Sequence, residues 1–163
     1  MRDIDWAKHN SNTAHTVANF TQPRCPTSLT YRGPCGREGH CESYVSSEAV
    51  WDLGARDLAN PGSGSAWATL DRLWYQSRST ATAAFVCNVS GTTWTSTGCA
   101  TGSLFRVFRA IDDDNGNLAD GTPHMTALHA AFDRHGIACA TPAPTNSGCA
   151  AGPSVAPALV ASP

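Results

Sequence analysis

The sequence predicts a mainly α-helical domain with irregular, disulfide-stapled loops. Apolar residues recur at spacings of three and four in several segments after residue 40, which is the pattern of amphipathic helices. Seven cysteines lie in sequence rich in Thr, Ser, Gly and Asn, which indicates loops held by disulfides. A chain of 163 residues that is 41% apolar has enough material for one core. We therefore expect a helical domain over residues 1–150 and a linker over residues 151–163.

The first helix is expected from Cys41 to about Leu58. One face of this segment carries Tyr44, Ser47, Trp51, Ala55 and Leu58. The turn sequence Asn60-Pro61-Gly62 ends it. The residues before it have no helical period and are interrupted by Pro23, Pro26, Gly33, Pro34, Gly36 and Gly39. Irregular structure is therefore expected over residues 1–40.

Two further helices are predicted from apolar stripes. One has Ser65 as its N-cap and a stripe of Trp67, Leu70, Leu73 and Trp74. The other covers residues 103–111 and has an apolar face of Leu104, Phe105, Val107, Phe108 and Ile111. Arg106 and Arg109 are expected on the opposite face of this second helix.

The last helix is marked at both ends. Thr122 is the expected N-cap, Pro123 suits the first helical position, and Gly136 suits the left-handed residue after the helix. The buried stripe is expected to be Met125, Leu128 and Phe132. Beyond this helix the chain becomes rich in Pro, Ala and Ser without a period, which is typical of a linker.

The cysteine spacing suggests two short disulfide loops. Cys87 and Cys99 flank one Gly/Thr/Ser-rich loop, and Cys139 and Cys149 flank another. The remaining three are Cys25, Cys35 and Cys41, so one cysteine is left over. Either it pairs with a cysteine outside this chain, or it is a free buried thiol.

Composition argues against several classes of partner. The net charge is -2 and 15% of residues are charged, so there is no basic stripe for nucleic acid. No run of apolar residues is long enough to span a membrane. The cysteine content is typical of a secreted protein, yet the first ten residues contain no signal-peptide pattern. We therefore expect part of a longer, extracellular protein.

The sequence contains no complete zinc motif. "GREGHCESYVSSEAVWDL", from Gly36 to Leu53, holds an H-x-E pattern, but the deaminase motif that uses it also needs C-x-x-C, which the chain lacks. The H-E-x-x-H motif is also absent.

The acidic run after the third helix has two interpretations. Its oxygen-bearing side chains suggest a calcium site with Asp112, Asp114, Asn117 and Asp120 as ligands. The EF-hand pattern does not fit, because aligning Gly116 with the sixth loop position places Ile111 at the first ligand position. The alternative is a loop of Asx turns that caps the following helix.

Two stretches together resemble a known family. "EGHCESYVSSEAVWDLGARDL" and "NLADGTPHMTALHAAFDRHGIAC" are similar to the C-terminal part of a secreted bacterial zinc metallopeptidase related to the fungalysins and to the thermolysin-like gluzincins. The resemblance implies a helical domain like the C-terminal lobe of such a peptidase. It also implies that H-E-x-x-H and the zinc ligands lie in an N-terminal catalytic half that this chain lacks, and that the partner is a peptide or protein substrate.

The same resemblance implies roles for four residues. His40 matches the histidine that stabilises the oxyanion of the tetrahedral intermediate. Glu42, Tyr44 and Glu48 follow on the same helix and are expected to line the substrate cleft. Two features depart from the family: Gly39 replaces the more usual Val, and the upstream Asp is missing from "YRGPCGRE".

Two functions are therefore expected. The first is the distal half of a secreted zinc endopeptidase, inactive as this isolated chain. The alternative is a disulfide-stapled, calcium-binding extracellular module in which Trp67, Trp74 or Trp94 contacts a ligand.

Overall fold

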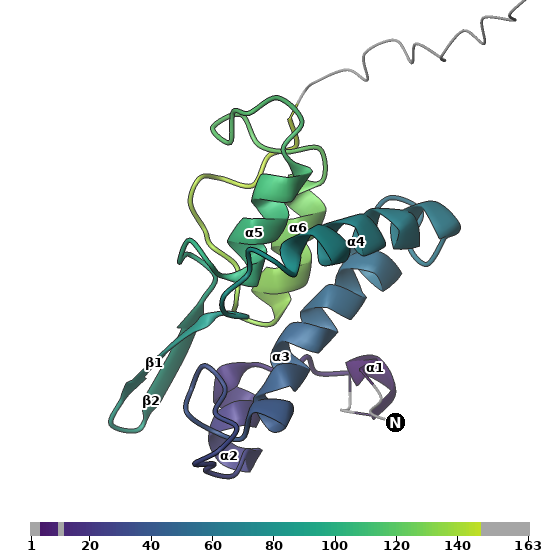
Figure 1. Ribbon diagram of the computed structural model, residues 1–163. Coiled ribbons are helices and arrows are strands. Elements are labelled where there is room, and N and C mark those ends of the chain that lie inside the picture. Colours follow the sequence, from purple (N-terminus) through teal and green to yellow (C-terminus); the bar gives the residue numbers. More distant parts are fainter. Residues whose placement is uncertain (1–3, 10–11, 148–163) are drawn as a thin grey trace, which may run out of the picture.

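Helices and one hairpin pack around a shared core in the computed structural model, which describes residues 4–9 and 12–147 (Figure 1). The α-helices are α1 (Trp6–His9), α2 (Gln22–Arg24), α3 (Gly39–Asp52), α4 (Gly64–Ser77), α5 (Leu104–Asp112) and α6 (Met125–Arg134). Two π-helical turns, η1 (Val17–Thr21) and η2 (Leu53–Asp57), precede α2 and follow α3. The strands are β1 (Val86–Ser90) and β2 (Thr93–Thr97). The expected linker over residues 151–163 lies outside the described residues.

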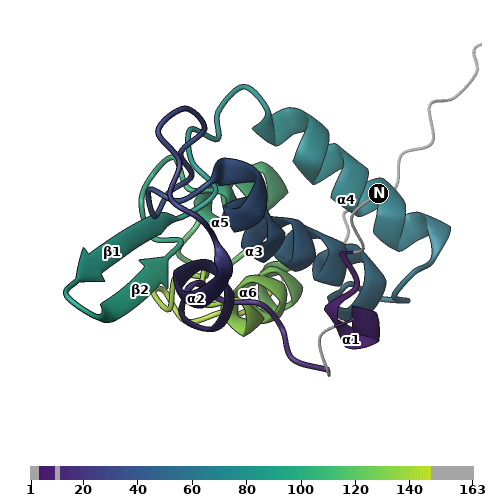
Figure 2. The same ribbon diagram turned by 90° about the horizontal axis from the view of Figure 1, so that it is seen from below.

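The hairpin makes the expectation of a mainly α fold wrong. β1 and β2 pair antiparallel, from Val86 opposite Thr97 to Ser90 opposite Thr93, so the fold is a small mixed domain with helices and a sheet. The turn contains Gly91 with φ of +56°, a conformation that glycine adopts without strain. Sequence analysis expected a loop here, although Val and Thr are β-branched and favour strands. Both views show the hairpin extending beyond the helices (Figures 1 and 2).

The predicted helix over residues 41–58 is confirmed, with an earlier start. Glu38 is its N-cap, because the side chain accepts hydrogen bonds from the backbone N–H groups of His40 and Cys41. The helix continues through η2, where Gly54 lies against α4. A Cβ at Gly54 would come within 2.5 Å of the Trp67 ring, so glycine allows α4 to pack closely here.

The other three predicted helices are also present, with shifted starts. α4 is capped by Ser63 instead of Ser65, because the Ser63 hydroxyl accepts from the N–H of Ala66 at 3.2 Å. α6 begins at Met125 instead of Pro123, since the Thr122 hydroxyl donates to Asp112 and does not cap the helix. The stop at Gly136 is confirmed by its φ of +67°.

The core lies between α3, η2, α4, α5 and α6. Its centre is aromatic: Phe132 lies 5.6 Å from Phe105 and 5.7 Å from Phe108, between ring centroids. The three phenylalanines are fully buried. The apolar stripes predicted for α5 and α6 point to the core. The face predicted for α3 is wrong, because its fully buried side carries Val45 and Ala49, and Trp74 of the α4 stripe is 50% exposed. Arg109 was expected on the polar face of α5 but is buried, at 5% exposure.

Three disulfides connect segments that are far apart in sequence. Cys25 pairs with Cys41, Cys35 with Cys87, and Cys99 with Cys139. The expected pairs Cys87–Cys99 and Cys139–Cys149 are therefore wrong. The pairing of β1 with β2 explains why Cys87–Cys99 is wrong. Cys87 lies opposite Ser96, and Cys99 lies beyond the end of β2. Cys149 lies outside the described residues.

Candidate functional site

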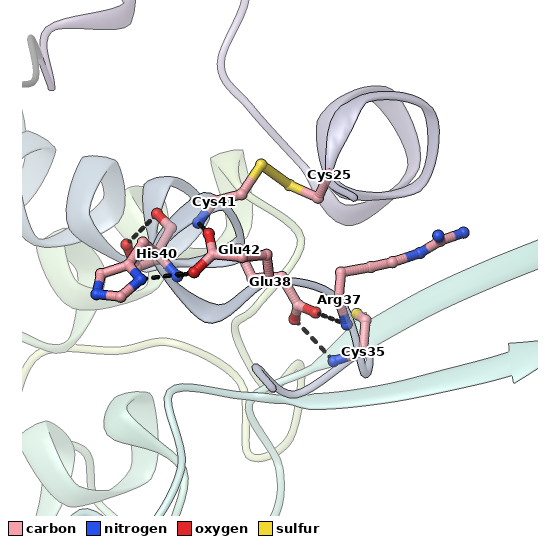
Figure 3. Close-up of a disulfide and its surroundings, with 8 residues drawn as sticks. Cys25, Cys35, Arg37, Glu38, His40, Cys41 and Glu42 are labelled. Carbon is pink, nitrogen blue, oxygen red and sulfur yellow. Dashed lines mark hydrogen bonds and ion pairs between the residues drawn. A yellow bond between two sulfur atoms is a disulfide. The ribbon is translucent and has the colours of Figure 1, made fainter. Parts of the chain in front are cut away.

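His40 lies at the exposed start of α3 and is held by a carboxylate. Its Nδ1 is 2.5 Å from Glu38 Oε1, and 65% of the His40 side chain is exposed (Figure 3). The His40 side chain also packs edge-on against Tyr31, with ring centroids 5.7 Å apart. The hydrogen bond from His40, the largest cause, lowers the pKa of Glu38, so Glu38 is ionised at neutral pH. The ring is thus oriented by an anion at a solvent-facing helix start.

Glu42 is fully buried in the first turn of α3, two residues after His40. Its carboxylate accepts hydrogen bonds from the backbone N–H groups of Cys35, at 2.8 Å, and Arg37, at 2.5 Å (Figure 3). Desolvation by burial is the largest influence and raises the pKa of Glu42, against the effect of these two bonds. Gly33 allows this arrangement, since a Cβ there would lie 2.7 Å from the carboxylate. Glu42 borders a groove of about 370 Å³ and fixes the loop that forms its wall.

Tyr44 and Glu48 lie on the side of α3 that faces the N-terminal segment. Tyr44 packs against Phe20 at 5.4 Å and against His15 at 6.0 Å between centroids. Glu48 is fully buried, and its carboxylate contacts His15 Nδ1 at 2.6 Å and accepts from the His15 backbone N–H at 3.1 Å. Glu48 therefore lies in the protein interior and not in a cleft beside His40, where it was predicted.

A buried polar network that the sequence did not reveal continues from Glu48. His135 is fully buried, and its Nδ1 donates to the His15 carbonyl at 2.8 Å while Nε2 lies 3.2 Å from Asp52 Oδ2. Asp52 also accepts from Trp6 Nε1 at 2.9 Å and pairs with Arg56 at 2.7 Å and with Arg134 at 2.6 Å. The network ties the N-terminal segment to α3, η2 and the end of α6.

The network keeps Asp52 ionised despite its burial. Desolvation is the largest influence and acts to raise the pKa of Asp52. Hydrogen bonds from His135, Trp6 and Arg134 outweigh it, so the pKa is lowered. These hydrogen bonds join residues that are 46 to 83 positions apart in the sequence, so no local motif predicts them.

Asp112, the first expected calcium ligand, is buried at the end of α5 and faces α6. Its carboxylate contacts His124 Nδ1 at 2.7 Å and accepts from the Thr122 hydroxyl at 2.8 Å. Arg72 of α4 pairs with it at 3.2 Å. Desolvation, the largest influence, acts to raise the pKa of Asp112, but the hydrogen bonds from His124 and Thr122 outweigh it and lower the pKa.

The other expected calcium ligands form separate contacts. Asp114 accepts from the Ser147 hydroxyl at 3.4 Å, Asn117 accepts from the Ala119 N–H at 3.2 Å, and Asp120 accepts from Asn115 Nδ2 at 2.9 Å. The Asn117 contact is an Asx turn, and Asp113 and Asn115 likewise accept from the N–H two residues on, which matches the Asx-turn interpretation of the loop. Over residues 4–9 and 12–147, no three His, Cys, Asp or Glu side chains converge as a metal site would require.

Asp112→Asn should lower the free energy of unfolding at pH 7 by about 2 kcal/mol. The loss is moderate because Arg72 and His124 are 43% and 33% exposed and can bind water instead. A carboxyl group with a lowered folded-state pKa stabilises the fold above its unfolded pKa of about 3.9, and this stability is lost as pH falls through the folded pKa. The wild type should therefore lose more stability on acidification than the variant.

Urea denaturation between pH 7 and pH 2.5 measures both effects of this substitution. Asp120→Asn is the control, since Asp120 is exposed in the same loop and should change stability by less than about 0.5 kcal/mol. If the free energy of unfolding falls equally with pH in the wild type and in Asp112→Asn, the Asp112 carboxylate does not have the lowered pKa inferred here.

The helices of the described ranges include none with the length and apolarity needed to cross a membrane. Comparison of the chain with models of protein families, with curated proteins and with solved structures finds no match.

Proposed function

We propose that this chain is the distal part of a secreted zinc endopeptidase and that His40 contributes to peptide-bond hydrolysis. The observation that carries the proposal is the Glu38–His40 pair at the exposed start of α3. A carboxylate on Nδ1 fixes the orientation of an imidazole, and an imidazole held in this way can stabilise a developing anion. In this chain Glu38, the last residue of "YRGPCGRE", supplies the carboxylate.

The proposal places the zinc ligands and the catalytic base outside this chain. The described residues contain no converging set of ligands, so they do not fit a zinc site of their own. A zinc ion held by ligands outside this chain would supply the activation of the attacking water. The residues of this chain supply the oriented His40 and the groove wall fixed by Glu42.

Secretion is part of the proposal and is supported by the disulfides. Three cysteine pairs join distant segments, and such bonds form and persist mainly in oxidising compartments. A peptidase acting outside the cell would gain resistance to unfolding from them.

The coding sequence directly upstream of Met1 is the first test. An in-frame H-E-x-x-H would support the proposal, and a signal peptide immediately before Met1 would contradict it. The purified, oxidised chain should also hold no stoichiometric zinc by elemental mass spectrometry and show no chelator-sensitive cleavage of casein. Tight zinc together with such activity would overturn the placement of the ligands.

In the protein expressed from the full reading frame, His40→Ala should lower kcat about 100-fold with little change in KM. The reason is that a donor to the oxyanion acts in the transition state and contributes little to substrate binding. His129→Ala is the control, because His129 lies on α6 and packs against Phe105. Equal kcat values for wild type and His40→Ala would contradict the proposal.

An extracellular binding module is a second candidate, favoured by one observation. An open groove of about 490 Å³ is lined by apolar side chains that include Trp51, Leu70 and Trp74, and Trp74 is 50% exposed. Grooves of this kind bind apolar ligands. A start codon and signal peptide directly before residue 1, with retained ligand binding by this chain alone, would favour this function.

A further inference from the structure

A third pocket lies along α5, separate from His40. Its volume is about 670 Å³. The walls combine threonine hydroxyls, two arginines and apolar side chains, and consist of Thr80, Thr82, Thr101, Gly102, Arg106, Val107, Arg109, Ala110, Ile111 and Leu118. The two arginines are three residues apart and so project from the same face of the helix.

Arg109 is buried in this wall, and its hydrogen-bond partner there is a backbone carbonyl. It is 5% exposed, and its Nη2 donates to the Leu118 carbonyl. Its Nε is buried and finds no acceptor among the residues that the structure describes. Within residues 4–9 and 12–147, no carboxylate forms an ion pair with Arg109. A buried guanidinium with an unmet donor is costly unless an anion reaches it.

The charges around Arg109 do not neutralise it. Desolvation is the largest cause that lowers the pKa of Arg109, and repulsion from Arg106 adds to it. Asp113 acts in the opposite direction but is the weaker influence. Arg106 is exposed and donates to the Cys99 carbonyl at 3.1 Å. Two positive charges therefore face the pocket, and Asp113 compensates them only in part.

The rest of the wall selects among anions. Val107, Ala110, Ile111 and Leu118 give the pocket an apolar side next to the arginines. A phosphate or sulfate ion would gain nothing from this side and would lose hydration there. A carboxylate with a short hydrocarbon chain matches both parts, because guanidinium pairs with planar carboxylates and the chain covers the apolar side.

We propose that this pocket binds a small aliphatic carboxylate, with the carboxylate on Arg109 and Arg106 and the hydrocarbon chain against Val107 and Ile111. This site is independent of the proposed peptidase function, because it uses neither His40 nor the groove at Glu42. The threonine hydroxyls at its rim can donate to the second carboxylate oxygen.

Nuclear magnetic resonance of the full chain labelled with ¹⁵N tests the proposal. The Nε–H signal of Arg109 should shift on titration with hexanoate, with a dissociation constant on the order of 1 mM. Hexanol, which has the same chain without the charge, should leave this signal unchanged. Inorganic phosphate at equal ionic strength should shift it at least tenfold more weakly. An unmoved Arg109 signal, or equal binding of hexanol or phosphate, would overturn the proposal.

Three variants separate binding from folding. Arg109→Gln should abolish hexanoate binding, and exposed Arg106→Gln should weaken it about fivefold with the fold intact. Arg78→Gln is the control, because Arg78 is exposed directly after α4 and lies over the Tyr75 ring, 4.1 Å from its centroid. Should Arg109→Gln not fold, the decision rests on Arg106→Gln and the Arg109 signal: unchanged affinity in Arg106→Gln would overturn the proposal.

Discussion

Asp52→Asn should lower the free energy of unfolding by about 3–5 kcal/mol, because it leaves buried partners without their anion. The Asp52 side chain is fully buried and has four partners: Trp6, Arg56, Arg134 and His135. His135 is also fully buried and Trp6 is 9% exposed, so water cannot replace the carboxylate there. This differs from Asp112, whose charged partners are partly exposed.

Urea denaturation at pH 7, followed by circular dichroism, measures the loss for Asp52→Asn. The indole N–H of Trp6 in the ¹⁵N-labelled protein provides a local nuclear magnetic resonance signal, since it donates to Asp52. Asp133→Asn is the control: Asp133 is exposed on α6, and the substitution should change stability by less than about 0.5 kcal/mol. A loss below about 1 kcal/mol for Asp52→Asn would show that the network is not the main link between the N-terminal segment and the helices.

Elements with local determinants could be predicted from the sequence. The apolar stripe of residues 103–111 predicted α5, and Gly136 predicted the end of α6 through its left-handed backbone. In each case the residues that decide the structure are within one or two turns of one another. The hairpin also has local signals, in the β-branched residues around Gly91, but the cysteines at either side favoured a loop interpretation.

Features that depend on distant partners could not be predicted. In the sequence, Asp52 is an ordinary polar residue of a predicted helix. Its partners in the buried network, Trp6 and His135, are 46 and 83 positions away in the sequence. Arg109 was expected on the solvent face of its helix. It is instead covered, with Leu118 of the following loop accepting its hydrogen bond. His40 differs, because Glu38 lies two residues before it and the pair could have been read from the sequence.

Removal of the Cys35–Cys87 disulfide should cost about 4 kcal/mol, the largest loss among the three disulfides. The bond closes a loop between residues 52 apart in sequence, against 40 for Cys99–Cys139 and 16 for Cys25–Cys41. Loop closure restricts the unfolded chain more as the loop grows, so the shortest loop should cost about 3 kcal/mol. The double variant Cys35→Ser/Cys87→Ser tests this.

The same bond has a second, structural effect that the loop model does not include. Cys35 donates its N–H to the buried Glu42 carboxylate, and Cys87 is in β1, so the disulfide anchors the groove wall to the hairpin. Thermal denaturation of the oxidised double variants, with Cys25→Ser/Cys41→Ser as the matched control, measures the order of losses. A larger loss for the Cys25–Cys41 pair would show that contacts at the start of α3 outweigh the entropy of the unfolded chain.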